Sequence, residues 1–286
     1  MRAMRATPGD VAVSGATYFG ERAVNEDSWC AAHSLGLAVV ADGMGGHQGG
    51  EVASALAVLA ALEAISAACE VAPPPRVGQA GISLRAELAS LVDALASVVP
   101  LRPPSPPADV AAWVVEAVRC ANERILSAVR ARRELTGIGA TLALVFAGRG
   151  EALLASVGDT RIYRLRDGAL AQLSTDHTLQ RELETASPPV AYDRAQWDAA
   201  TFGAILVRAV GMRDPVKTDV RVELLRPGDV FLVCSRGLHR AVAHDHLAAI
   251  LTEHAAPPHA ARALIDAAAA ARAEENATAC VLRVLP

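Results

Sequence analysis

The sequence lacks paired cysteines of the kind that bind zinc or form a dense disulfide framework. None of its cysteines stands in a Cys-x-x-Cys spacing, which argues against both arrangements. We therefore expect buried free thiols in a reducing compartment. The five cysteines are Cys30, Cys69, Cys120, Cys234 and Cys280.

An excess of basic charge is also missing. The formal net charge is −4 and the isoelectric point is near 6.1, so the chain has no field with which to collect nucleic-acid phosphates. The basic opening "MRAMRATPGD" is not followed by an apolar segment, and the most apolar run, residues 53–69, carries Glu63. We expect a cytoplasmic monomer without a membrane span, an export signal or a nucleic-acid partner.

The order of the predicted elements indicates an α+β fold. With 52% hydrophobic and 20% charged residues, the composition is that of a globular protein with a sizeable core. Strands precede helices, many strands follow, and helices come again before a last strand, which favours antiparallel sheets with helices on their outer faces. Strands are predicted over 11–17, 37–41, 141–173, 220–224, 230–234 and 278–285, and helices over 51–70, from 109 and twice between 244 and 275.

Proline-rich brackets surround residues 71–109. We interpret this segment as an insertion with one amphipathic helix inside a single domain of residues 8–286. It is either a semi-rigid surface excursion or an element that docks a partner.

Acidic residues and glycines recur at the ends of predicted strands. They occur in "NED" at residues 25–27, "DGMGG" at 42–46, "GDTR" at 158–161 and "EN" at 275–276. Carboxylates that gather without histidine or cysteine suit a hard divalent cation such as Mg²⁺ or Mn²⁺. Each fragment alone is also ordinary turn chemistry, so the prediction depends on their common arrangement.

The collinear order of these motifs identifies a family. The run "GERAVNEDSW", "VVADGMGGHQGGEVAS", "GIGATLALV", "ASVGDTRIYRLRDG", "LLRPGDVFLVCSRGL" and "ENATACVLRV" resembles the metal-dependent protein phosphatases of type 2C in their bacterial form. The resemblance implies a four-layer α-β-β-α sandwich of two antiparallel sheets flanked by helices. It also implies one or two Mn²⁺ or Mg²⁺ ions, and a phosphorylated protein, a Ser/Thr kinase included, as partner.

The resemblance also assigns roles to individual positions. Arg22 matches an arginine that grips the substrate phosphate, and Asp27 an acid that steadies the site through waters. The reaction implied is attack by a metal-activated water on phosphoserine or phosphothreonine. The metal-ligand positions are matched by Glu26, Asp42, the carbonyl of Gly43, Asp159 and Glu275.

Two positions depart from the family pattern. Glu275 replaces an aspartate and keeps its charge, whereas Arg236 in "VFLVCSRGLHRAV" stands where the family has a metal-ligand aspartate. An arginine cannot deprotonate to relieve this reversal of charge. Arg236 could fill the place of a lost cation and clamp phosphate with Arg22, point away from the site, or pair with Asp42 or Glu275 in an inert site.

Two functions follow from these alternatives. The first is a metal-dependent Ser/Thr phosphoprotein phosphatase attenuated by Arg236. The second is a pseudophosphatase, a module that binds a phosphoprotein or kinase without turning it over.

Overall fold

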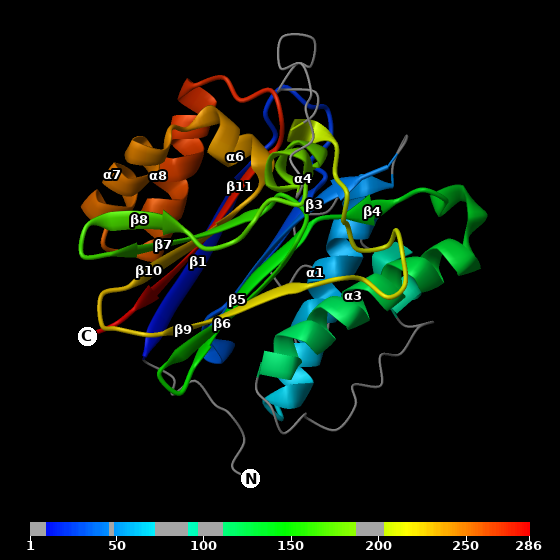
Figure 1. Ribbon diagram of the computed structural model, residues 1–286, viewed down its shortest axis with the longest axis horizontal. Helices are drawn as coiled ribbons and strands as arrows, with labels where there is room; N and C mark the ends of the chain where they lie inside the picture. The colour runs from blue at the N-terminus through cyan, green and yellow to red at the C-terminus, as the bar shows by residue number, and fades with distance from the viewer. Residues whose placement is uncertain (1–9, 46–48, 72–90, 97–110, 187–202) are drawn as a thin grey trace.

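Two antiparallel sheets lie face to face, with helices on both outer faces (Figure 1). This arrangement confirms the predicted α-β-β-α sandwich. The computed structural model describes residues 10–45, 49–71, 91–96, 111–186 and 203–286.

The first sheet joins the two ends of the chain. Its strand order is β1-β11-β10-β7-β8, so the first and last strands of the described chain lie side by side. Their register pairs Val11 with Val284 and Tyr18 with Ala277. The strands are β1 (Val11–Tyr18), β7 (Arg161–Arg166), β8 (Ala169–Gln172), β10 (Val230–Cys234) and β11 (Ala277–Val284).

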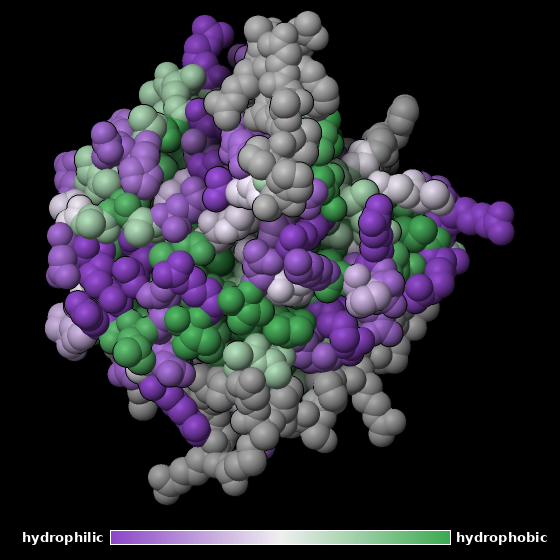
Figure 2. Space-filling model, viewed as in Figure 1, coloured by the Kyte–Doolittle hydropathy of each residue, from purple (hydrophilic) through white to green (hydrophobic). Residues whose placement is uncertain are grey.

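The second sheet has the order β2-β3-β5-β6-β9, and β4 pairs with the end of β3. Its outer strand β9 exposes Val220, Val222 and Leu224. Figure 2 shows apolar surface along this edge, bordered by hydrophilic residues. The strands are β2 (Asp27–Ala32), β3 (Leu37–Met44), β4 (Gly139–Ala140), β5 (Leu142–Gly148), β6 (Glu151–Val157) and β9 (Asp219–Leu224).

Three apolar clusters hold the four layers together. The first lies between the second sheet and the helices α1 and α3. The second lies between the first sheet and α6, α7 and α8, and the third lies between the sheets, where Val40, Val145, Phe231 and Leu282 meet. The helices are α1 (Gly50–Ala68), α3 (Ala111–Ala131), α4 (Leu179–Thr185), α6 (Arg236–Ala241), α7 (His244–Glu253) and α8 (Pro257–Ala270), with 3-10 turns η1 (His33–Leu35) and η3 (Arg133–Leu135).

Helix α1 is apolar on all sides because it lies in the core. Among the described helices, it is the one long and apolar enough to cross a membrane. However, most of it is buried inside the structure, where α1 packs between the second sheet and α3. Its composition is therefore that of a core helix.

Local structure differs from the sequence prediction at two places near the sheet ends. No strand was predicted between residues 17 and 37, but β2 begins at Asp27 and pairs with β3. No helix was predicted directly after β10, but helix α6 begins at Arg236. In both places polar residues occupy regular structure because their side chains are bound in the interior, as at Asp27 and Ser235.

The predicted insertion at 71–109 lies mostly outside the described residues. Residues 91–96 are helical, and Val92 and Leu95 are buried in the first apolar cluster. This part of the segment thus contributes to the core.

Candidate active site

Two aspartates face each other across adjacent strands. Asp27 opens β2, and the β2–β3 register places it opposite Asp42. Asp27 is fully buried, and its Oδ2 accepts hydrogen bonds of 2.6 Å from both Ser235 Oγ and Thr278 Oγ1. Ser235 directly follows β10 and Thr278 lies in β11, both in the first sheet, whereas Asp27 lies in the second sheet. The Asp27 carboxylate therefore connects the two sheets at the site.

The second oxygen of Asp27 is an exception to this bonding. Within the described part of the chain, Oδ1 is buried and has no hydrogen-bond partner. Burial raises the pKa of Asp27 to about 7, against the effect of the Ser235 and Thr278 hydrogen bonds, and the charges of Glu275 and Glu26 add to the rise. An unpaired buried oxygen of this kind needs a water or an ion.

Glu26 is held by the backbone around it. The Gly43 N–H donates a 3.0 Å hydrogen bond to the Glu26 carbonyl, and the Glu26 N–H donates to Asn276 Oδ1 at 2.9 Å. A Cβ on Gly43 would lie 1.9 Å from the Gly50 carbonyl oxygen, and one on Gly50 would lie 2.3 Å from Glu26 Oε1. Gly43 is therefore required for the close approach of α1 to β3, and Gly50 leaves room for the Glu26 side chain.

Asn276 organises the loop that carries Glu26. Its Nδ2 donates to the carbonyls of Phe19 and Val24 at 2.7 and 3.1 Å, so one buried side chain holds three backbone groups of this loop. The sequence placed Asn276 beside the acidic motif but gave no signal for this role, because its partners are about 250 residues away.

Asp159 lies at a turn supported by a buried histidine. The Gly158 N–H donates to His177 Nδ1 at 3.0 Å, and His177 Nε2 lies 3.1 Å from Asp219 Oδ2. Burial lowers the pKa of His177, so the ring is neutral and can accept from Gly158. His177 therefore positions the turn before Asp159.

Arg236 points into the cluster of acids. Its Nη2 donates a 2.7 Å hydrogen bond to Glu275 Oε1, and its Nε lies 3.7 Å from Asp159 Oδ2. Among the alternatives for Arg236, the side chain does not point away, and within the described residues its ion-pair partners are Glu275 and Asp159 rather than Asp42. Its Nη1 is buried without a described partner.

The remaining acids of the site are buried or half-buried close to one another. Burial raises the pKa of Asp42 well above its ordinary value, and the charges of Asp27 and Asp159 add to the rise. Burial likewise raises the pKa of Asp159 to about 6, while the charge of Arg236 lowers it. Crowded carboxylates of this kind are stabilised by a cation.

Arg22 lies at the exposed mouth of the same site. Among the described residues, its guanidinium has no salt bridge or hydrogen bond, although its charge lowers the pKa of Glu26, which burial raises. It is thus available to a ligand.

These residues line one cavity of about 320 Å³. It brings together all the predicted site residues except Asp27, which supports the cavity from behind. Asn276 and Thr141 also line it; Thr141 Oγ1 accepts from the Asp42 N–H at 3.0 Å. The predicted residues in the lining are Arg22, Glu26, Asp42, Gly43, Asp159, Arg236 and Glu275.

Oxygen donors line one side of the cavity and Arg236 lies on the other. In the described part of the chain, no three His, Cys, Asp or Glu side chains are grouped closely enough to hold a metal ion. Two carboxylates, Glu26 and Asp42, line the cavity with the Gly43 backbone, and oxygen donors of this kind suit Mn²⁺ or Mg²⁺. On the other side, the guanidinium of Arg236 bonds to the carboxylates that a second ion would need.

Comparisons with known proteins show the family to which the chain is similar. The family model described as protein phosphatase 2C matches residues 15–268. The serine/threonine phosphatase stp of Listeria welshimeri is 27% identical over 242 residues, which cover 85% of this chain and 82% of that protein. The serine/threonine protein phosphatase PstP of Mycobacterium tuberculosis is 32% identical over 228 residues, 78% of this chain and 35% of PstP.

The fold matches solved structures over nearly the whole chain. The catalytic domain of PstP in complex with two manganese ions superposes with a TM-score of 0.70 at 26% identity. The match covers 96% of this chain and 99% of that one.

Proposed function

Because the chain belongs to the protein phosphatase 2C family, we propose that it hydrolyses phosphoserine and phosphothreonine in proteins, at a rate attenuated by Arg236. The observation that carries this proposal is the gathering of Glu26, Asp42 and Gly43 in a cavity that Arg22 borders and Arg236 enters. Relatives of the same family are serine/threonine phosphatases, and one binds two manganese ions.

Glu26, Asp42 and the Gly43 carbonyl would hold one divalent ion. The chemistry that a bound Mn²⁺ or Mg²⁺ supplies is polarisation of phosphate oxygens and a lowered pKa of a nearby water. Asp27 would accept a hydrogen bond from water through its free Oδ1, since Oδ2 is already fixed by two hydroxyl groups. The buried aspartate thereby orients solvent in the site.

Arg22 and Arg236 would both bind the phosphate. The guanidinium of Arg22 is exposed and unpaired among the described residues, so it can donate two hydrogen bonds to phosphate oxygens. Arg236 has a free Nη1 in the same cavity, next to its bond with Glu275. Together they would orient the substrate.

Arg236 also attenuates the reaction. A unit charge pair at ~4 Å is worth about 4 kcal/mol at an effective dielectric of ~20, and the charge of a divalent ion doubles the repulsion. Solvent screening reduces this repulsion. However, Arg236 also forms ion pairs with Glu275 and Asp159, so these carboxylates are less available to a metal ion. A second ion on that side would therefore bind far more weakly than the first, and phosphate activation would be incomplete.

The same salt bridge favours a second candidate function, binding without turnover. If the Arg236–Glu275 pair leaves the site too inert for catalysis, Arg22 and Arg236 could still hold a phosphoprotein or its kinase. Retained phosphopeptide binding with no hydrolysis would favour this candidate.

The test of the proposal is Mn²⁺-dependent hydrolysis of a phosphothreonine peptide by the natural protein and by Asp42→Ala. We expect turnover that requires Mn²⁺ and exceeds that of the variant. Equal rates for the two proteins would exclude catalysis at this cavity.

A further inference from the structure

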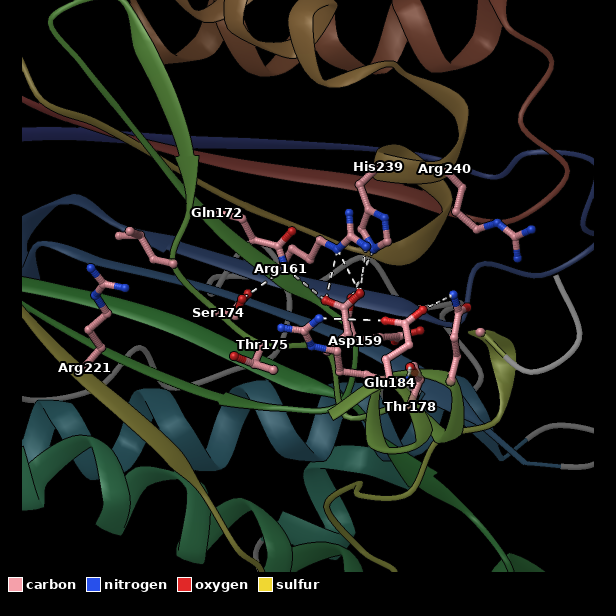
Figure 3. Close-up of a pocket in the computed structure, with 15 residues that line it drawn as sticks. Asp159, Arg161, Gln172, Ser174, Thr175, Thr178, Glu184, Arg221, His239 and Arg240 are labelled. Atoms are coloured by element: carbon pink, nitrogen blue, oxygen red, sulfur yellow. Dashed lines mark hydrogen bonds and ion pairs between the residues drawn. The ribbon is translucent and has the colours of Figure 1, made fainter. Parts of the chain in front are cut away.

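A second, larger cavity adjoins the candidate active site. Its volume is about 760 Å³, within the range of ligand-binding clefts, and Asp159 lines both cavities. It lies between β7, β8, α4 and α6 (Figure 3). A peptide bound with its phosphate at Arg22 and Arg236 would therefore have this cavity next to it.

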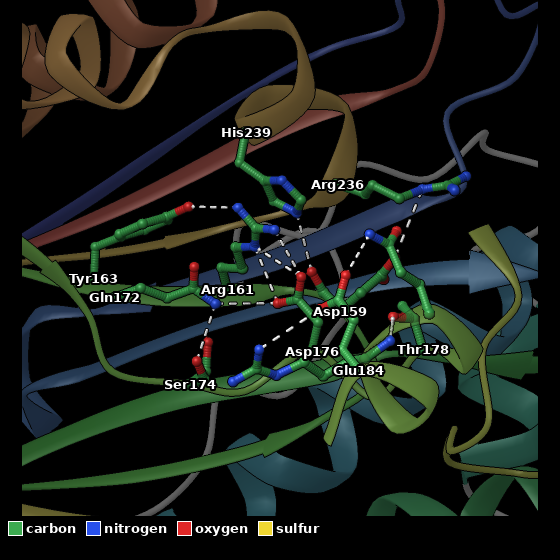
Figure 4. Close-up of polar contacts among 12 residues, drawn as sticks. Asp159, Arg161, Tyr163, Gln172, Ser174, Asp176, Thr178, Glu184, Arg236 and His239 are labelled. Carbon is green, nitrogen blue, oxygen red and sulfur yellow. Dashed lines mark hydrogen bonds and ion pairs between the residues drawn. The ribbon is translucent and has the colours of Figure 1, made fainter. Parts of the chain in front are cut away.

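The carboxylates of this second cavity are already paired. Asp176 accepts hydrogen bonds from Arg161 Nε and Nη2 at 3.0 and 2.7 Å, and another from Gln172 at 3.1 Å (Figure 4). Glu184 accepts a 2.9 Å hydrogen bond from Gln180 and lies 3.7 Å from Arg181, and Asp159 lies 3.7 Å from Arg236. Each of the three carboxylates of the lining thus has a basic partner.

Three arginines of the same cavity are open to solvent. Arg240 is exposed and has no hydrogen bond or ion pair among the described residues. Arg221 is half exposed and bonds to Glu223 through Nε, which leaves its two Nη groups free within the described chain. Arg181, also half exposed, has only a 3.7 Å ion pair with Glu184.

Ring and hydroxyl groups complete the lining without adding negative charge. His239 lies 3.1 Å from the carbonyl of Asp159 through Nε2. Ser174 and Thr175 add hydroxyl groups to the wall. The lining has four arginines against three carboxylates, so its surplus charge is positive.

We propose that this cavity binds acidic side chains of the phosphoprotein substrate next to its phosphorylated residue, with Arg181, Arg221 and Arg240 as the binding residues. The proposal rests on the proposed function, because the shared residue Asp159 connects this cavity to the phosphate site. It names the substrate class as phosphoproteins with carboxylates beside the phosphate. Arginine suits carboxylates because its guanidinium donates two parallel hydrogen bonds.

The spread of the arginines argues for an extended ligand. Figure 3 shows Arg221 and Arg240 on opposite sides of the lining, with Arg161, Ser174 and Asp159 between them. A single small anion cannot contact both, whereas consecutive acidic side chains of a peptide can. This distribution favours a peptide segment over free phosphate.

The experiment measures binding and hydrolysis of three phosphothreonine peptides that differ only in their flanks: glutamates, alanines or lysines. Each peptide is tested with the natural protein, Arg240→Ala and the Arg221→Ala/Arg240→Ala pair. Arg262→Ala on α8 is the matched control, because Arg262 is exposed, pairs with Asp266 and lies outside both cavities. Removing Arg240 breaks no described hydrogen bond, so this variant should fold normally.

We expect the glutamate peptide to bind the natural protein more tightly than the alanine peptide, and the lysine peptide to bind least. The double variant should lose about fivefold in affinity for the glutamate peptide and little for the alanine peptide, as expected for two exposed ion pairs. Raised salt should shrink this difference. Equal binding of all three peptides, or the same loss in Arg262→Ala, would overturn the proposal.

The experiment distinguishes failure of the proposed catalysis from failure of the proposed binding of acidic side chains. A glutamate preference in binding without any hydrolysis would support this inference and overturn catalysis. Metal-dependent hydrolysis with no flank preference would support catalysis and overturn this inference. Tighter binding of a second phosphate alone, without any response to glutamate, would also contradict it.

Discussion

The guanidinium of Arg236 lies 2.7 Å from Glu275 and so joins the first residue of α6 to the loop before β11. Both residues line the cavity that also contains Glu26 and Asp42. The site thus contains a fixed positive charge among its acids. The proposed effect of Arg236 on metal binding rests on this relationship.

Stability of the metal-free protein should fall as pH rises. The pKa of Asp27 rises from 3.8 to about 7 on folding, so between these values the folded state holds a proton that the unfolded state releases. Asp159, whose pKa rises to about 6, acts in the same direction. We expect the free energy of unfolding in EDTA to decrease between about pH 4 and pH 7 through these groups, and Mn²⁺ to reverse the loss at neutral pH.

Urea unfolding at pH 5 and pH 7.5 checks this prediction. Asp27→Asn is the control, because an amide oxygen can accept the bonds of Ser235 and Thr278 without carrying a charge. Its stability should depend less on pH than that of the natural protein. Identical pH slopes for the two proteins would show that Asp27 does not titrate as its burial implies.

Gly50→Ala should fold but bind metal poorly. Gly50 begins α1, where alanine is favoured, but the new Cβ would lie 2.3 Å from Glu26 Oε1 and push this side chain away. We expect a melting temperature within a few degrees of the natural value and a Mn²⁺ affinity lowered by about tenfold or more. Calorimetric titration measures the affinity, and unchanged Mn²⁺ binding would remove Glu26 from the ligand set.

Arg22→Ala should weaken the use of substrate rather than the fold. A charge-assisted hydrogen bond is worth about 1.5–3 kcal/mol, so we expect kcat/KM to fall by about tenfold to a hundredfold. Because Arg22 is exposed and has no salt bridge in the described chain, the melting temperature should not change. Arg22→Lys keeps the positive charge but loses the planar guanidinium that can donate two parallel hydrogen bonds. Full activity of this variant would argue against bidentate phosphate binding.

His177→Ala should loosen the turn that carries Asp159. The change leaves the Gly158 N–H without its acceptor and removes a contact of Asp219, which costs about 1–3 kcal/mol in stability. His177→Gln is the matched comparison, because its amide oxygen could accept from Gly158. If both variants unfold at the same denaturant concentration as the natural protein, His177 has no positioning role.

Several strands and helices follow from local sequence signals, whereas the site residues were assigned through the family resemblance. Alternating and continuous apolar runs predicted β10 and β11, and glycines followed by alanine-rich helix predicted α1, because burial requires these patterns. β2 and α6 were not predicted because residues far away in the sequence satisfy the hydrogen bonds of their polar side chains, as Ser235 does for Asp27. The direction of Arg236 and the roles of Asn276 and His177 depend on contacts across the sandwich, which no local pattern encodes.

The sequence did not indicate the larger cavity beside the candidate active site, for the same reason. Its arginines come from β9, α4 and α6, which are separated by tens of residues, and each looks like an ordinary surface charge in the sequence. These arginines indicate an anion-binding cavity only when the structure shows that Asp176 and Glu184 have their own arginine partners.

The most direct test of the account is the number of Mn²⁺ ions bound by the natural protein and by Arg236→Asp, measured by calorimetry alongside phosphothreonine peptide hydrolysis. The account predicts one tightly bound ion and slow turnover for the natural protein, and a second ion with faster turnover for the variant, because the change replaces a repelling charge with a ligand. Two tightly bound ions in the natural protein, with no gain in rate for Arg236→Asp, would contradict it.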